Sequence, residues 1–202
     1  MKFHTSFIGL ILVFLLVVSG CSVQNKDKMH SSKVVGDIQK MNPINDEFLV
    51  EKHEDYAEML RVEKGLSKEE ADEETYRVQL HEVAIINRAI DVGIKVSEEE
   101  ALQEANKTRQ MLKEVEGVEN AEVALTKTQE TIEKLGISED EYWNKFVINS
   151  FIQSLMKEKL IEYERIENPE MNWNERQEEI IEEFKSNESL QINEFKKEIG
   201  LN

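Results

Sequence analysis

The chain has 202 residues and a formal net charge of −17, from 42 acidic and 25 basic side chains. A surface this acidic argues against nucleic-acid binding and against electrostatic docking on anionic lipid. The single cysteine, Cys21, excludes a disulfide within one copy of the chain. Prolines are rare, and Glu, Lys, Leu, Ile and Ala are frequent, so we predict an all-α fold.

The amino-terminal residues resemble a bacterial lipoprotein signal. An uncharged apolar run extends from Phe7 to Val18, and it is shorter than the roughly 20 residues needed to span a bilayer. The run leads into Val18-Ser19-Gly20-Cys21, which matches the lipobox. The resemblance implies a diacylglyceryl group on the Cys21 sulfur, cleavage before Cys21 and acylation of the new amino terminus, for example by palmitate. The alternative is an ordinary signal peptide that contains a cysteine.

We therefore divide the chain into three parts. Residues 1–20 are the expected signal peptide, residues 21–40 the lipidated tether, and residues 41–202 the helical domain. Two or three acyl chains form a stable anchor, since each buried methylene contributes about 0.8 kcal/mol. We expect the domain to be held at the outer face of the cell membrane.

Apolar side chains at helical spacing predict a succession of helices in the domain. In the first, Phe48, Lys52, Tyr56, Met59 and Leu60 are expected to share one side. The fourth is expected to be capped by Asn120, and the last to break at Ser186-Asn187. A short extended piece is possible at residues 33–38. The predicted helical ranges are 46–64, 68–91, 98–115, 120–135, 139–166 and 171–199.

Three similar turns separate these helices. In each, a glycine ends one helix and a serine followed three residues later by glutamate begins the next. Glycine adopts the left-handed conformation at little cost, and the serine and glutamate form a capping box. The three turns are Gly65 with Ser67/Glu70, Gly93 with Ser97/Glu100, and Gly136 with Ser138/Glu141.

The stretch AIDVGIKVSEEEALQEANKTR, residues 89–109, resembles the helical region of the SurA/PrsA chaperones and foldases. KLGISEDEYWNKFVINSFIQSLMKEKL, residues 134–160, is similar to the next segment of that family. The resemblance implies a multi-helix lobe like the SurA amino-terminal domain, acting on exported polypeptides. Family members usually also carry a parvulin prolyl isomerase domain, but this chain has no histidine-bearing β-rich segment to supply one. Isomerase activity is therefore not expected.

No arrangement typical of an enzyme stands out in the sequence. His53 and His81 fall on predicted helices and His30 on the tether, without the His-Glu-x-x-His spacing of a zinc site. A lone helical histidine is usually a surface or partly packed residue. No nucleophile elbow or phosphate-binding loop is present, so we expect no enzymatic activity, no metal and no cofactor.

Aromatic and methionine side chains are concentrated in the last third of the chain. The simpler interpretation is that they form the core. The alternative is that some line an apolar groove for unfolded segments or a partner helix. The candidate client-binding residues are Tyr142, Trp143, Phe146, Phe151, Met156 and Trp173.

These observations lead to two principal hypotheses of function. The first is a membrane-anchored, non-enzymatic chaperone or foldase-like lipoprotein that binds unfolded or secreted polypeptides. The alternative is a structural or adaptor lipoprotein that docks one specific envelope protein. A transporter's substrate-binding lipoprotein is a weaker third possibility, because the chain lacks an alternating βα pattern.

Overall fold

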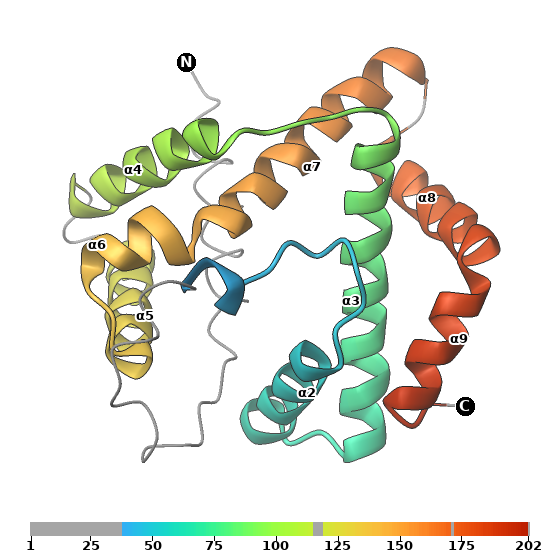
Figure 1. The fold of residues 1–202 in the computed structure, drawn as a ribbon, viewed down its shortest axis with the longest axis horizontal. Helices are drawn as coiled ribbons and strands as arrows, with labels where there is room; N and C mark the ends of the chain where they lie inside the picture. Colours follow the sequence, from blue (N-terminus) through green and yellow to red (C-terminus); the bar gives the residue numbers. More distant parts are fainter. Residues whose placement is uncertain (1–37, 115–118, 171, 202) are drawn as a thin grey trace. The chain divides into compact units, whose positions relative to one another are not determined.

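The structure, a computed structural model, describes residues 38–114, 119–170 and 172–201. Within these ranges the regular elements are all helical, which confirms the all-α class (Figure 1). Of the possible extended piece at residues 33–38, only Ile38 is described, and it begins a 3-10 helix. The elements are η3 (Ile38–Met41), α2 (Val50–Lys64), α3 (Lys68–Asp91), α4 (Glu98–Glu114), α5 (Glu119–Leu135), α6 (Glu139–Glu141), the π-helix η4 (Tyr142–Phe146), α7 (Ile148–Glu167), α8 (Trp173–Asn187) and α9 (Ser189–Glu198).

The three predicted capping boxes are confirmed. Each serine hydroxyl accepts the backbone N–H of its glutamate, at 3.1–3.3 Å, and each glutamate accepts the serine N–H at 2.9 Å. The glycine before each box has a positive φ, for example 78° at Gly93, where a side chain would be strained. These caps begin α3, α4 and α6 at the predicted residues.

The first helix begins later than predicted, at Val50 rather than Asp46. Asn45 explains the difference, because its polar groups bond to other helices. Its backbone N–H donates to the Gln153 side chain at 2.9 Å, and its amide donates to Glu82 at 2.6 Å. The preceding segment is therefore held as a loop, and Leu49 precedes the helix without a side-chain cap.

Two other predicted boundaries are also corrected. Helix α5 begins at Glu119, so Asn120 lies inside the helix and is not its cap. The break in the last segment is at Glu188, just after the predicted Ser186-Asn187. Asn172 caps α8, since its side-chain oxygen accepts the N–H of Glu175 at 3.0 Å.

The predicted continuous helix at residues 139–166 is interrupted. After the single turn of α6 comes the π-helix η4, in which the Val147 N–H donates to the Tyr142 carbonyl at 3.1 Å. A π turn takes one residue more than an α turn, which shifts the side chains that follow around the helix axis. Tyr142, Trp143 and Phe146 of η4 are all buried. The usual helical period therefore does not hold across this point.

The chain folds into two compact units. The first combines residues up to Pro43 with Ser97–Phe151, and the second combines Ile44–Val96 with residues from Ile152 onward. The core of the first contains Ala101, Ala105, Leu112, Ile132, Trp143 and Phe146. The core of the second contains Leu60, Val83, Ile85, Leu160 and Ile180.

Asparagine side chains hold η3 against η4 in the first unit. The Asn42 amide donates to the Phe146 carbonyl at 3.1 Å and to the Ser150 hydroxyl at 2.6 Å. The Asn149 amide donates in return to the carbonyls of Gln39 and Asn42, at 3.2 and 2.9 Å. These bonds satisfy buried backbone groups where the helix geometry changes.

Helix α3 is central to the second unit, with α2 on one side and α8 on the other (Figure 1). A buried ion cluster links α3, α7 and α8. Glu164 accepts hydrogen bonds from Arg88 at 2.8 Å and from Arg176 at 2.9 Å. Since a buried charge must be paired to be tolerated, the cluster fixes these helices together.

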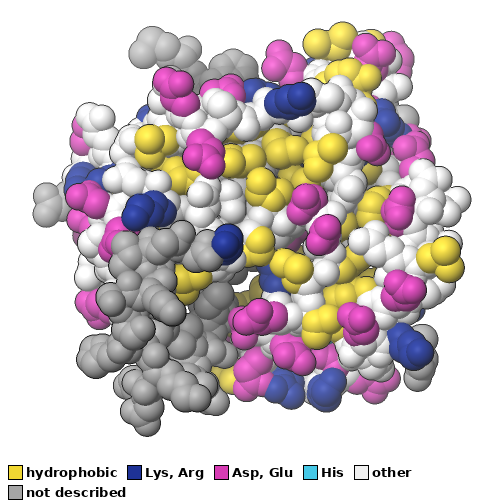
Figure 2. Space-filling model, viewed as in Figure 1, with side chains coloured by type: hydrophobic (Ala, Val, Ile, Leu, Met, Phe, Trp, Pro, Cys, Tyr) yellow, Lys and Arg dark blue, Asp and Glu magenta, His cyan; other side chains and the backbone are white. Residues whose placement is uncertain are grey.

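The acidic residues outside this cluster lie mainly at the surface. Figure 2 shows Asp and Glu side chains scattered over the visible face and interspersed with Lys and Arg. Exposed pairs within one helix, such as Glu104 and Lys107 at 3.1 Å, are typical. Most of the negative charge therefore belongs to solvated helix faces. In the described residues, no helix is long and apolar enough to span a membrane.

Candidate functional site

The second unit contains an open pocket of about 550 Å³ beside a buried histidine. It lies between the middle of α2, the first turns of α3 and the end of α9. We call it the histidine pocket. It is lined by His53, Glu54, Asp55, Ala57, Glu58, Arg61, Lys68, Asp72, Glu198, Ile199 and Gly200.

His53 forms the inner wall of the pocket and is only 2% exposed. Its ring packs edge-on against Phe195, with centroids 5.7 Å apart. Neither ring nitrogen has a hydrogen-bond partner in the described residues, and Nε2 is 3.6 Å from the nearer Asp72 oxygen. Burial lowers the pKa of His53, although the Asp72 carboxylate opposes this. The imidazole is therefore neutral at pH 7, with Asp72 in loose contact at Nε2 and no close hydrogen bond at either nitrogen.

Asp72 is the second buried polar group of the pocket. The capping box at Ser67 fixes the start of α3, and Asp72 lies one turn into the helix. Its side chain is 11% exposed, whereas that of its ion-pair partner, Lys68, is 70% exposed. The carboxylate is thus reached from solvent by a flexible ammonium group.

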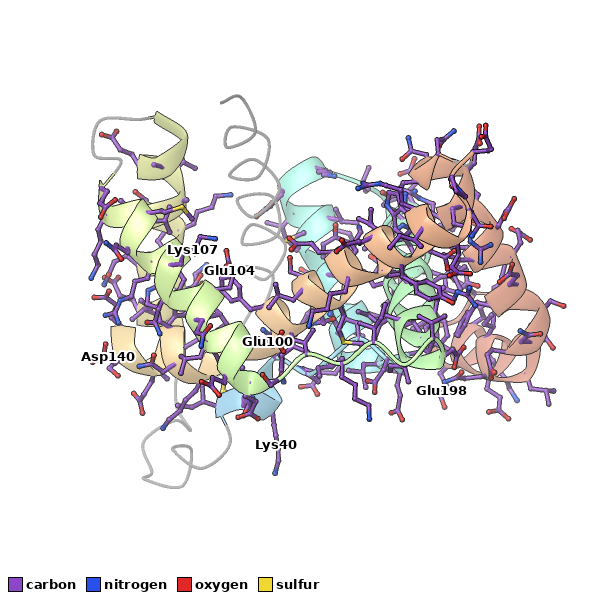
Figure 3. All side chains as sticks on the ribbon, turned by 90° about the horizontal axis from the view of Figure 1, so that it is seen from above. Lys40, Glu100, Glu104, Lys107, Asp140 and Glu198 are labelled. Atoms are coloured by element: carbon purple, nitrogen blue, oxygen red, sulfur yellow. The ribbon has the colours of Figure 1, made fainter. Side chains whose placement is uncertain are left out.

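The rim of the pocket is predominantly acidic. Glu54, Asp55, Glu58 and Glu198 line it, and Arg61 forms an ion pair with Glu58 (Glu198 is labelled in Figure 3). Partial burial raises the pKa of Asp55, as do the neighbouring carboxylates of Glu51 and Glu54. This crowding of like charges would be relieved by a cation.

The polar groups at the base of the pocket are hydrogen-bond acceptors. A neutral imidazole and a carboxylate can both accept a hydrogen bond from a ligand. In the described residues, no group of three or more His, Cys, Asp or Glu side chains could hold a metal ion. The pocket thus presents hydrogen-bond acceptors and an excess of carboxylates to solvent.

The structure places the six predicted client-binding residues mainly in the interior. Those in the first unit are Tyr142, Trp143, Phe146 and Phe151, all at most 5% exposed. Met156, in the second unit, is 6% exposed, and Trp173 is partly buried at the start of α8. Burial raises the pKa of the Tyr142 phenol to about 12, despite a hydrogen bond with Thr128. Five of the six side chains therefore present no surface to a client in this conformation.

The exposed large apolar side chains are spread over several helices. The most exposed are Val62, Ile166 and Leu190, at 73%, 68% and 80%, on α2, α7 and α9. Single exposed apolar residues are normal on a protein surface. The predicted lipid attachment site, Cys21, lies outside the described residues and stays a prediction.

The importance of His53 was missed at the level of sequence. The face predicted for the first helix included Lys52, Tyr56, Met59 and Leu60, and of these only Leu60 is buried, together with His53 and Ala57. The buried face is thus rotated by about one residue. The spacing of four and then three from His53 to Ala57 and Leu60 is a regular helical stripe, and it could have indicated a buried histidine.

Comparison with known proteins overturns the predicted resemblance. No model of a known protein family and no solved structure matches the chain. The glutamate-rich protein GrpA of Alkalihalophilus pseudofirmus (strain ATCC BAA-2126 / JCM 17055 / OF4) is 60% identical over 158 residues. The match covers 78% of this chain and 99% of GrpA. The assignment to the SurA/PrsA family was therefore wrong. It depended on glycine turns and capping boxes, which many helical proteins share.

Proposed function

The chain belongs to the family of the glutamate-rich protein GrpA, and we propose that it is a lipid-anchored helical adaptor. It would dock one polypeptide partner at the outer face of the cell membrane. The observation that carries this proposal is the histidine pocket, a concave site with buried polar groups that lack partners. Such a site suits specific binding, because a ligand that satisfies those groups recovers their desolvation cost.

The sequence around Cys21 supports the location. Val18-Ser19-Gly20-Cys21 follows a short apolar run, the order expected of a lipidated and cleaved export signal. Lipid attachment there would hold the helical units close to the membrane and raise their effective concentration near membrane proteins.

The adaptor hypothesis is preferred to the chaperone hypothesis for two reasons. The family resemblance that suggested a chaperone is wrong, and the side chains proposed to hold clients are mostly buried. A chaperone needs a broad apolar surface that accepts many sequences. A pocket lined by charged groups is instead suited to discriminate among partners.

Affinity capture of the full chain from cross-linked, detergent-solubilised membranes of its own host tests the proposal. The bound proteins are quantified relative to the chain itself. We expect one partner in a near-equimolar amount. In the control, the same chain is captured at high salt without cross-linking, and this partner should then be absent. Many substoichiometric proteins would contradict the adaptor role and favour a chaperone.

A further inference from the structure

We propose that the histidine pocket receives a cationic side chain, lysine or arginine, presented by the polypeptide partner. The inference rests on the proposed adaptor function and names the chemistry of the group that is recognised. His53 and Asp72 are the buried acceptors at the base of the site, and Glu54, Asp55, Glu58 and Glu198 form its rim.

The balance of charge in the pocket selects a cation. Among the described residues, five carboxylates line it, against the two cationic side chains of Arg61 and Lys68. Arg61 is already committed to Glu58 at the rim. A positive ligand is attracted by the remaining carboxylates and relieves the repulsion at Asp55, whereas an anion would be repelled.

The buried histidine supplies a reason for a hydrogen-bonding cation rather than a diffuse counter-ion. The ring of His53 is nearly inaccessible, and both nitrogens lack partners in the described residues. When the side chains around the ring shift to admit the ligand, the neutral imidazole accepts a hydrogen bond from an ammonium or guanidinium N–H. The same group can donate to Asp72, whose oxygen lies 3.6 Å from the ring. Charge-assisted bonds of this kind are about twice as strong as neutral ones.

The chain's own Lys68 already makes the kind of contact proposed for the partner's cation. This side chain is largely exposed, yet its ammonium group pairs with the buried Asp72 carboxylate. The pocket thus accommodates an ammonium group at Asp72 without disturbing the helices. Since the pair lies within one turn of α3 and the Lys68 side chain is largely exposed, an incoming cation can displace the lysine.

Binding of a labelled peptide to the full chain, purified in non-ionic detergent, tests the inference. The peptide alternates lysine with glycine and serine, and its fluorescence anisotropy is measured. Two controls are used. The first is the same peptide with acetylated lysines, and the second is cadaverine, a free diamine that competes with the peptide. We expect the lysine peptide to bind, the acetylated peptide to bind at least about tenfold more weakly, and cadaverine to compete poorly.

Substitutions then locate the contact. Asp72→Asn should weaken peptide binding about tenfold, since it removes a charge-assisted bond without changing side-chain shape. Glu63→Gln removes one charge from an exposed position of α2 outside the pocket and should leave binding unchanged. His53→Phe keeps an aromatic ring against Phe195 and should weaken binding about fivefold. It provides a second assay if Asp72→Asn fails to fold by circular dichroism.

The competing lysine gives a test of opposite sign. Lys68→Gln should tighten peptide binding about threefold, because it frees Asp72. Lys64→Gln makes the same charge change at the end of α2, outside the pocket, and should leave peptide binding unchanged.

Several results would overturn the inference. These are no binding of the lysine peptide, equal effects of Asp72→Asn and Glu63→Gln, or equal effects of Lys68→Gln and Lys64→Gln. Competition by cadaverine as strong as that of the unlabelled peptide would assign the pocket to a free polyamine instead. None of these results bears on the capture of one membrane partner. The adaptor function and the recognition of a cationic side chain are therefore tested by separate experiments, and one can be contradicted without the other.

Discussion

Glu164 lies on α7 with only 3% of its surface exposed, and two guanidinium groups reach it there. Burial alone would raise the pKa of this carboxyl, but hydrogen bonds from Arg176 and Arg88 outweigh burial and hold it below its ordinary value. The Asn168 amide donates a further bond at 2.9 Å. The carboxylate is thus fully partnered, in contrast to His53, whose nitrogens are not. In this respect the Glu164 cluster differs from the proposed binding site at His53.

Glu164→Gln should lower the free energy of unfolding by about 3 to 5 kcal/mol, because it leaves two partly buried arginines without their shared anion. Urea unfolding at pH 7, followed by circular dichroism, measures the change. Glu183→Gln is the matched control, since Glu183 contacts the same Arg176 but is 53% exposed. The control should cost less than about 1 kcal/mol. Equal losses would contradict the structural role given to Glu164.

Acidification should destabilise the protein through His53. Burial lowers its pKa in the folded state, and the nearby Lys68 charge lowers it further. The carboxylates of Asp72 and Glu54 raise the pKa but do not outweigh burial. Phe195 covers the ring from α9 without a charge. As the pH falls below the ordinary value of 6.5, the unfolded chain takes up a proton that the folded chain does not. The free energy of unfolding therefore falls with pH in this range.

Urea unfolding at about pH 7.5 and pH 5.5 measures this effect, with His53→Phe as the comparison. The variant should lose less stability than the unmodified chain between the two pH values. The remaining loss includes His81, whose pKa burial also lowers. Parallel losses in both proteins would contradict the buried, neutral state of His53.

At the scale of elements, the helix boundaries set by local chemistry were predictable. Helix α3 has the predicted bounds, Lys68 to Asp91, because Ser67 and Gly93 act on the adjacent backbone alone. The start of α2 and the π-helix η4 were not predictable, since Asn45 and Asn42 bond to residues more than thirty positions away. The helical period alone does not report such contacts.

Removing one cap should have a local and modest cost. Ser138→Ala should lower the free energy of unfolding by about 1 kcal/mol, because the first turn of α6 loses its side-chain acceptor. Ser189→Ala is the control, since Ser189 begins α9 without serving as its cap. It should change stability by less than about 0.5 kcal/mol. Chemical denaturation of both variants measures the difference, and a reversed order would contradict the capping role.

The candidate site depended on contacts that only the fold reveals. His53 and Asp72 come from two helices, and Glu198 is far from both in sequence. Pairs of acids and bases are too frequent in this chain for such a combination to stand out. The core aromatics are the reverse case. Their concentration in the last third of the chain was recognised, but it does not distinguish a core from a groove, and the structure places five of the six inside.

At the scale of the whole molecule, the proposal combines an anchor with a binding site. Cys21→Ala should shift the protein from the membrane fraction to the soluble fraction, or leave it unprocessed, because no thiol remains to be lipidated. Cell fractionation and intact-mass measurement of the amino terminus record the change. Ser22→Ala keeps the cysteine and should remain in the membrane. Membrane retention of a processed Cys21→Ala form would contradict the lipobox assignment.

Site-specific photo-crosslinking in the host membrane tests whether one partner docks at the histidine pocket. A photoreactive residue replaces Arg61 at the rim of the histidine pocket or, as the control, the exposed Ile166 on α7. We predict one discrete adduct from position 61, weakened by Asp72→Asn, and none of that mass from position 166. Adducts of many masses from position 61, or the same adduct from both positions, would contradict a partner docked at this pocket.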